Sequence, residues 1–325
     1  MATLEITFLQ GQLEDRKQRL QQAITLAPRN GALASLLREV DSALERMDKG
    51  TYGICEECHE AIEQGRLMAN PLVRYCLDHL TQIQRAALQR DLDLAAEVQR
   101  NLLPPPNLCV ADWETSYHYA PQGPVSGDYC DLIESDGQLF FVLGDVSGKG
   151  VAASMLMTQL HALFRSLVGL GLPLSRIVAQ ANRVLCESAM AGQYATLVCG
   201  LAKAAGEVEI HNAGHCPVIV VRRGEPFLID SIGFPLGMFP EGDFSAACLK
   251  LEAGDSLFLY TDGFSESTCG EAEYGIERAT SFVHQHSHRP AAGLISACLD
   301  DLRTFTSGNP QADDLTLLAI QRRAS

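Results

Sequence analysis

The segment LFFVLGDVSGKG, residues 139–150, is an apolar run of strand character that ends in a glycine and a carboxylate, Asp145. The segment SLFLYTDGF, residues 256–264, repeats this arrangement with Asp262, and Asp313 stands just before the apolar run LTLLAI. Mg²⁺ and Mn²⁺ select oxygen ligands and need several of them to converge. Three strand ends that each present a carboxylate therefore predict a site for hard divalent cations.

The composition favours a cytoplasmic protein with packed cores. The chain has 325 residues, which is about two domains by length, and 46% of them are hydrophobic and 20% charged. The sequence contains no apolar run of 18 residues, and residues 1–22 lack the pattern of a secretory signal. The 11 cysteines of such a chain are expected to be thiols or metal ligands rather than disulfides.

The net charge of −15 is concentrated in the C-terminal part of the chain. Residues 106–325 hold 13 Lys and Arg against 25 Asp and Glu. An acidic surface repels phosphate backbones, which argues against nucleic acid as a direct partner of this part. We expect no membrane partner either.

The N-terminal segment predicts a helical hairpin. Residues 5–26 are polar and helix-prone, and the cluster of helix breakers at 27–31 predicts a turn. Apolar residues between 33 and 47 then recur three and four positions apart, as on one face of a helix. Two helices that share an apolar seam explain this pattern.

Residues 50–80 carry the spacing of a structural zinc site. Cys55 and Cys58 form one C-x-x-C pair, and Cys76 and His79 form a second pair on a later turn. Two such pairs can close a tetrahedron around Zn²⁺. His59 adjoins Cys58 and is a competing ligand, but the spacing favours His79.

This segment resembles the zinc fingers of the DksA/TraR family, in its opening GTYGICEECHEAI and its later RLMANP. The last ligand differs, because His79 stands where that family has a cysteine. In that family a helical hairpin acts on RNA polymerase through acidic residues at its tip. The tip here would be residues 28–30, Pro-Arg-Asn, without an acidic pair. The resemblance therefore implies the fold and the zinc, and makes RNA polymerase the partner only of an alternative function.

Residues 81–103 predict a helix that Pro104-Pro105-Pro106 ends. Its apolar stripe has to be buried, and dimerisation through this helix is one solution. We accordingly expect three parts: a hairpin with a zinc finger at 1–80, a linker helix for dimerisation or signal transmission at 81–105, and a catalytic domain at 106–325.

Short strands separated by turn signals dominate the rest of the chain. The predicted strands are 116–120, 129–134, 139–143, 195–201, 207–212, 218–222, 247–251, 256–260 and 315–320. Helices are predicted at 151–168, 174–190 and 291–304. The pattern favours an α+β fold with antiparallel sheets and helices packed outside them.

Five motifs occur in an order that resembles the PPM family of metal-dependent serine/threonine phosphatases, in its bacterial SpoIIE/RsbU branch. They are SGDYCD, GDVSGKG, NAGHCP, YTDGFSES and DDLT, and the helix end AEVQRNLLPP before them is also typical of that branch. The resemblance covers residues 97–320. It implies an antiparallel β-sandwich flanked by helices.

The resemblance also implies a binuclear Mn²⁺ or Mg²⁺ site, in which a metal-bridging hydroxide attacks the phosphorus of phosphoserine or phosphothreonine. The implied catalytic ligands are Asp128, Asp145, the Val146 carbonyl, Asp262 and Asp313. Residues expected to support them are Asp131, Gly144, Asn212, His215 and Asp314. Asp131 would orient a metal-bound water or cap a turn, and Asn212 and His215 would stabilise a hairpin near the site.

The expected function is that of a cytoplasmic phosphatase regulated by its zinc-finger domain. By family analogy its substrate is a phosphorylated regulator such as an anti-sigma-factor antagonist, and the linker helix forms a homodimer. The alternative is a transcription regulator of the DksA/TraR type that binds RNA polymerase and carries a phosphatase-like sensor domain. A third interpretation is phosphopeptide binding without turnover.

Overall fold

The structure is a computed structural model that describes residues 3–26, 31–79, 82–188, 192–231, 233–242 and 244–323. It divides into two compact units, residues 1–91 and residues 92–325. Of the turn predicted at 27–31, only Gly31 lies within the described residues.

The first unit is a helical hairpin that continues into a zinc-finger fold. Helices α1 (Thr3–Leu26) and α2 (Gly31–Asp48) bury a seam that includes Leu9, Leu13 and Val40. The same apolar cluster extends into the finger, which contains α3 (Gln64–Ala69) and the 3-10 turn Leu77–His79. The predicted helical region with a zinc-finger motif is therefore present.

Helix α4 (Gln82–Leu102) ends just before the triple proline, as predicted. On its surface Leu88, Leu94 and Val98 are exposed by 43%, 60% and 51%. Gln99, in contrast, is buried although it is polar. Several apolar residues of the stripe predicted on this helix are thus exposed to solvent in a single chain.

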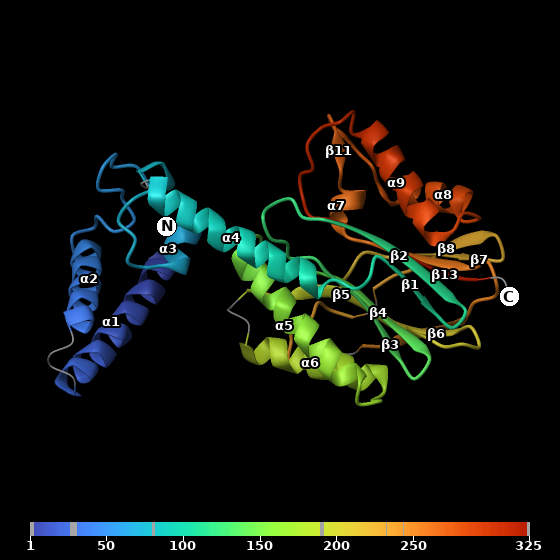
Figure 1. Cartoon of the computed structure of the whole chain (residues 1–325), viewed down its shortest axis with the longest axis horizontal. Coiled ribbons are helices and arrows are strands. Elements are labelled where there is room, and N and C mark those ends of the chain that lie inside the picture. The colour runs from blue at the N-terminus through green and yellow to red at the C-terminus, as the bar shows by residue number, and fades with distance from the viewer. Residues whose placement is uncertain are drawn as a thin grey trace. The chain divides into compact units, whose positions relative to one another are not determined.

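The second unit contains two antiparallel sheets (Figure 1). One has the order β1-β2-β13-β10-β7-β8, formed by β1 (Asn107–Val110), β2 (Trp113–Ala120), β13 (Leu315–Arg322), β10 (Ser256–Tyr260), β7 (Val218–Arg222) and β8 (Glu225–Ile229). The other has the order β3-β4-β5-β6-β9, formed by β3 (Tyr129–Ser135), β4 (Gln138–Val146), β5 (Ala195–Ala202), β6 (Glu207–Ala213) and β9 (Ala246–Lys250).

Three apolar layers hold this unit together. One fills the space between the two sheets, with Phe141 and Leu257 among its fully buried members. Helices α5 (Val151–Val168) and α6 (Leu174–Ser188) cover the five-stranded sheet. Helices α8 (Ile276–His286) and α9 (Ala291–Phe305) cover the six-stranded sheet (Figure 1). The expected sandwich of antiparallel sheets flanked by helices is confirmed.

Several short elements were not predicted. They are β1, β8, the hairpin of β11 (Thr268–Cys269) and β12 (Ala272–Glu273), α7 (Asp262–Ser265) and α8. Helix α8 has apolar residues at helical spacing, Ile276, Ala279 and Val283, which pack in the layer over the six-stranded sheet, so its sequence did carry a signal for a helix. Helix α6 is described from Leu174 to Ser188, and the last two residues of the predicted helix, 189 and 190, lie outside the described residues.

Among the described helices, α5 alone is long and apolar enough to cross a membrane by length and composition. It nevertheless buries Leu156, Leu160 and Phe164 in the layer against the five-stranded sheet. This is the pattern of a core helix in a folded domain.

Candidate functional site

The four aspartates of the predicted metal site stand at strand ends of both sheets. Asp128 directly precedes β3, and Asp145 is the second-last residue of the neighbouring strand β4. Asp262 begins α7 two residues after β10, and Asp313 stands two residues before β13. Because β10 pairs with β13 and β3 pairs with β4, the two pairs of aspartates come from two adjacent strands in each sheet.

Asp128 is buried and is held by two threonine hydroxyls. Its Oδ2 accepts hydrogen bonds from Thr261 Oγ1 at 3.0 Å and from Thr316 Oγ1 at 2.5 Å. Burial, offset in part by Thr316 and reinforced by the charge of Asp145, raises the pKa of Asp128 well above its ordinary value. Sequence analysis missed both threonines, although they lie within the YTDG and DDLT motifs.

Asp145, Asp262 and Asp313 lie close enough to repel one another. Burial and then the charges of Asp262 and Asp313 raise the pKa of Asp145 to about 7. Burial and the charge of Asp313 likewise raise the pKa of Asp262. Such a group of carboxylates carries negative charge that its surroundings do not neutralise, which is the electrostatic condition for binding divalent cations.

Lys149 forms an ion pair with one member of this group. Its Nζ lies 2.9 Å from Asp313 Oδ2 and donates to the Ala312 carbonyl at 3.4 Å. The side chain is 60% exposed, so water screens the pair. Sequence analysis assigned no role to this lysine.

Two glycines let the backbone approach the carboxylates. A Cβ at Gly127 would lie 3.3 Å from Asp145 Oδ1 and 3.0 Å from the Val146 carbonyl oxygen. A Cβ at Gly263 would lie 2.0 Å from the Asp314 carbonyl oxygen. The glycines beside the aspartates thus allow close packing of neighbouring segments within each sheet, the start of β3 on the end of β4 and the end of β10 on the start of β13.

Gly144 and Asp314 have supporting positions. A Cβ at Gly144 would lie 2.7 Å from the Thr196 carbonyl oxygen, so the glycine allows β4 to pack closely on β5. Asp314 accepts hydrogen bonds from the amides of Gln122 at 2.7 Å and Gly127 at 3.0 Å, one with each oxygen. Asp314 therefore holds the loop that leads to Asp128.

Asp131 is fully buried and is bound to helix α5. Its oxygens accept hydrogen bonds from Arg165 Nε at 2.9 Å and Arg165 NH2 at 2.6 Å. The Leu132 amide donates to the same carboxylate at 2.8 Å, and His161 Nε2 lies 3.6 Å away. Both oxygens are thus engaged in joining β3 to α5, which is neither of the two roles expected from the sequence.

Asn212 and His215 are joined by a hydrogen bond within one turn. Asn212 accepts a hydrogen bond from the His215 amide at 2.9 Å and donates to the Cys216 carbonyl at 3.2 Å. His215 Nδ1 lies 2.9 Å from Thr196 Oγ1, which donates to the Asp145 carbonyl at 3.4 Å. Burial lowers the pKa of His215 to about 4, so the imidazole is neutral at pH 7.

The loop before Asp128 is also held by α4. Gln99 Nε2 donates to the Ser126 carbonyl at 2.8 Å, and Gln99 Oε1 accepts from the Ser126 amide at 2.9 Å. Ser126 Oγ in turn accepts from the Asp128 amide at 3.0 Å. The end of the linker helix is thereby connected to a predicted ligand through two residues.

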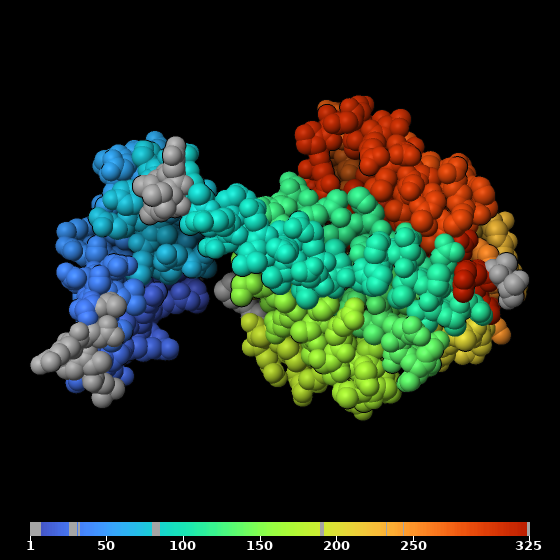
Figure 2. Space-filling model, viewed as in Figure 1, coloured from blue at the N-terminus to red at the C-terminus, as the bar shows by residue number. Residues whose placement is uncertain are grey.

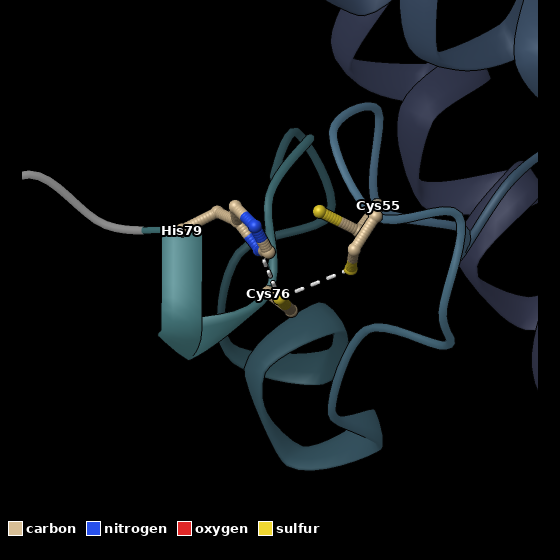
Figure 3. A group of neighbouring side chains, drawn as sticks. Cys55, Cys76 and His79 are labelled. Atoms are coloured by element: carbon tan, nitrogen blue, oxygen red, sulfur yellow. Dashed lines mark hydrogen bonds between the residues drawn. The ribbon is translucent and has the colours of Figure 1, made fainter.

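In the first unit, Cys55, Cys58, Cys76 and His79 offer ligand atoms that all lie within 4.8 Å of one another. Figure 3 shows the side chains of Cys55, Cys76 and His79 pointing toward a common point. Cys76 Sγ lies 3.1 Å from His79 Nδ1 and 3.7 Å from Cys58 Sγ.

The electrostatics of this cluster favour a thiolate. Burial by itself raises the pKa of Cys55, but hydrogen bonds from the backbone of Cys58, Cys76 and Glu57 outweigh it and lower the pKa to about 6. Thiolate and imidazole ligands in this number are those of a structural Zn²⁺ site. His59 is not part of the cluster found among the described residues.

Two family models match the chain. The model described as Stage II sporulation protein E (SpoIIE) matches residues 135–323. The model described as prokaryotic dksA/traR C4-type zinc finger matches residues 50–78. The second match ends one residue before His79, the position at which the cluster has a histidine instead of a fourth cysteine.

Two curated proteins and one solved structure are similar to the catalytic part. Protein IcfG of Synechocystis sp. is 25% identical over 262 residues, which are 71% of this chain and 41% of IcfG. Phosphoserine phosphatase RsbU of Bacillus subtilis is 24% identical over 245 residues, 73% of this chain and 71% of RsbU. The structure of the RsbU and RsbW domains of Rv1364c from Mycobacterium tuberculosis aligns with a TM-score of 0.60 and 27% identity, over 67% of this chain and 62% of that one. The chain thus spans less than two thirds of IcfG and of the mycobacterial chain.

Proposed function

This chain belongs to the SpoIIE family of PP2C-type phosphatases, and from that premise we propose that it is a metal-dependent protein-serine/threonine phosphatase of the cytoplasm. The observation that carries the proposal is the electrostatic coupling of three aspartates: burial and then the charges of Asp262 and Asp313 raise the pKa of Asp145 to about 7. Carboxylates that repel one another in this way are a common feature of sites that bind a ligand of opposite charge.

The residues fit a pair of Mn²⁺ or Mg²⁺ ions. Asp128, Asp145, Asp262 and Asp313 supply hard oxygen donors, and the Val146 carbonyl lies against the Gly127 backbone next to Asp145. When bound, the ions would supply a nucleophilic hydroxide at neutral pH and neutralise charge that develops on the phosphoryl oxygens. The side chains of the site include no lysine or histidine placed as a nucleophile, because Lys149 pairs with Asp313 and His215 is buried.

The chain itself would orient the ligands. Thr261 and Thr316 fix one oxygen of Asp128 and leave the other free to bind a cation. Asp314 and Gln99 hold the loop that precedes Asp128 from two sides. Preorganised ligands of this kind lower the cost of assembling the site when substrate arrives.

The proposed substrate is a phosphoserine or phosphothreonine residue of a bacterial regulatory protein. Support comes from RsbU, which is named a phosphoserine phosphatase and is 24% identical to this chain. An anti-sigma-factor antagonist is the example we favour. The acidic C-terminal part of the chain agrees with a protein substrate rather than a nucleic acid.

Phosphate release from a phosphoserine protein, measured with and without Mn²⁺, tests this function. We expect activity to require the metal and Asp145→Asn to lower kcat by more than about 100-fold. Asp136→Asn is the matched control, because Asp136 is exposed at the β3–β4 turn. Equal activity in Asp145→Asn and Asp136→Asn would refute the proposed site.

For the first unit we propose one structural Zn²⁺ held by Cys55, Cys58, Cys76 and His79. Metal analysis should find about one zinc per chain. The double change Cys55→Ser and Cys58→Ser should remove it, whereas His79→Cys should keep it, because a thiolate can replace the imidazole. Zinc retained in the double serine variant would contradict this assignment.

We further propose that α4 carries regulation from the zinc-finger unit to the phosphatase unit and forms a homodimer. Exposed Leu94 and Val98 are four positions apart on one helix face, which suits contact with a second copy. Light scattering of the full chain should give a dimer mass, and Leu94→Glu combined with Val98→Glu should give a monomer. A monomeric unmodified chain would contradict the dimer.

A further inference from the structure

A pocket of about 410 Å³ lies beside the proposed metal site in the second unit. One wall is the segment after α7, with Ser267 and Thr268, and another is the C-terminal end of α9, with Leu302 and Arg303. In Figure 1 α7, β11 and α9 lie at the same end of this unit, and in Figure 2 the red atoms of α9 face the solvent there. The volume is in the range of sites that bind small ligands or a few peptide residues.

The lining of the pocket is connected to the carboxylate group through neighbouring residues of the chain. Ala312 lines it and is the residue before Asp313, and Ser267 lies five residues after Asp262. Gln311, also in the lining, donates to the Asp313 carbonyl at 2.5 Å. Residues that flank a phosphoserine held at the carboxylates would therefore lie near this lining, since an extended chain advances roughly 3.3 Å per residue.

The lining is apolar at its base and polar at its rim. Leu302 and Leu315 are buried, and Leu299 is half-buried between them and the opening. Hydroxyl and amide groups surround this base, among them those of Thr306 and Gln311. A base of leucines suits an aliphatic side chain, and the rim offers partners to the backbone amides of an extended peptide.

The charge of the pocket differs from that of the rest of the unit. Residues 106–325 are strongly acidic, yet the described side chains that line the pocket include Arg303 and no acidic residue. His118 also lines it, but burial and the charge of Arg303 lower its pKa, so the imidazole is neutral at pH 7 and adds no charge. Arg303 forms an ion pair with exposed Asp300, at 3.2 Å. An acidic group of a ligand is thus attracted here and repelled by most of the surrounding surface.

We propose that this pocket binds the part of the phosphoprotein next to the phosphoserine, taking an aliphatic side chain on its leucine base and an acidic residue at Arg303. The inference rests on the proposed phosphatase function and deepens it. In this proposal the pocket determines which substrate sequences bind, whereas the carboxylates act on any phosphate monoester.

A position scan tests the preference. The full chain with Mn²⁺ is given seven-residue phosphoserine peptides of alanine that carry one leucine at each position from three before to three after the phosphoserine. We expect one position to lower KM about tenfold, which corresponds to about 1.4 kcal/mol of binding. A glutamate one position farther out should lower KM again, and Arg303→Glu should remove this second gain. If KM is the same within twofold for leucine at every position, the pocket does not bind this side chain of the substrate, and the inference is overturned.

Filling the pocket tests its location. Thr306→Trp places a large side chain in the pocket, and the leucine advantage should fall from about tenfold to about one. Thr304→Trp is the matched control, because Thr304 is exposed on the same helix and does not line the pocket. If Thr306→Trp does not fold, Thr268→Trp fills the pocket from the opposite wall, where the side chain is exposed. A leucine advantage that survives in the folded filled variant would overturn the inference.

A binding arm separates this inference from the phosphatase proposal. If the unmodified chain releases no phosphate from any peptide or from p-nitrophenyl phosphate, the phosphatase proposal fails. The same peptides with a photoreactive leucine are then cross-linked to the chain, and the labelled residues are identified by mass spectrometry. Labels on 118–120, 267–270, 299–312 or 315 support the pocket, and labels elsewhere overturn it.

Discussion

Gln99 binds both backbone groups of Ser126, donating to its carbonyl at 2.8 Å and accepting from its amide at 2.9 Å. The glutamine is buried near the end of α4, and Ser126 stands two residues before Asp128. A rotation or shift of α4 would therefore change the loop that presents a proposed ligand. This contact gives the proposed regulation a specific route.

Replacing Gln99 by methionine should weaken metal binding. The change keeps the shape of the side chain and removes both hydrogen bonds, so the loop before Asp128 loses its fixed position. We expect the Mn²⁺ dissociation constant, measured by titration calorimetry, to rise by about 10-fold. Asn101→Leu is the control, because Asn101 is exposed two residues along the same helix. Equal Mn²⁺ affinity in the two variants would show that Gln99 serves only the packing of α4.

The two threonines that hold Asp128 give a second prediction. Thr261→Val or Thr316→Val removes one hydrogen bond to a buried carboxylate, which leaves that charge less stabilised. The pKa of Asp128 should rise further, and Mn²⁺ affinity should fall by about 10-fold in each variant. Thr280→Val is a suitable control, since the Thr280 hydroxyl is buried without a hydrogen-bond partner in the described structure. Its removal should leave affinity unchanged and stability equal or slightly higher.

Asp131 and Arg165 give a prediction about stability rather than chemistry. Asp131→Asn removes the carboxylate partner of Arg165, whose side chain is 43% exposed, and should lower the free energy of unfolding by about 1–3 kcal/mol, measured in urea. Asp301, the partner of Arg278, is 17% exposed where Asp131 is fully buried, so Asp301→Asn should cost about 1 kcal/mol or less. Mn²⁺ affinity of folded Asp131→Asn should stay within twofold of the unmodified chain. A large loss of affinity at unchanged stability would instead support the expected role of Asp131 in orienting a metal-bound water.

The parts of the site that could be predicted are those that neighbouring residues in the sequence indicate. Asp145 and Asp262 each follow an apolar run, and Cys55 and Cys58 form a recognisable pair, so their chemistry could be inferred from neighbouring residues. The antiparallel sandwich could be predicted for the same reason, because the longer strands are apolar runs between turn residues.

The missed parts depend on contacts between distant segments. Thr316 meets Asp128 from 188 residues away, and Lys149 meets Asp313 from 164 residues away. A threonine at position 316 or a lysine at position 149 does not by itself indicate which distant residue it contacts. Strand β8 has the sequence EPFLI, in which apolar residues follow one another instead of alternating with polar ones. Its adjacent residues Phe227 and Leu228 are both exposed, so burial does not alternate along it either.

The pKa of Asp145 predicts how the stability of the metal-depleted protein depends on pH. Burial and the charges of Asp262 and Asp313 raise the pKa from the ordinary 3.8 to about 7 in the folded chain. Between these values the folded state holds a proton that the unfolded state has lost, so stability is greatest at low pH and falls as pH rises through about 7. The slope from this group is up to about 1.4 kcal/mol per pH unit. Asp262, whose pKa is raised in the same direction, adds to it.

Urea unfolding of the chelator-treated chain between pH 5 and pH 8 measures this slope. Below pH 5 the protonation of other groups determines the stability. Asp145→Asn should flatten the curve and stabilise the metal-depleted protein at pH 8, because the neutral amide no longer repels Asp262 and Asp313. Asp136→Asn, at the exposed turn, should leave the slope unchanged. Saturating Mn²⁺ should reverse the trend in the unmodified chain, since the cations bind the ionised carboxylates. Stability that rises with pH without metal and is indifferent to Asp145→Asn would mean that these carboxylates do not repel one another in the folded protein.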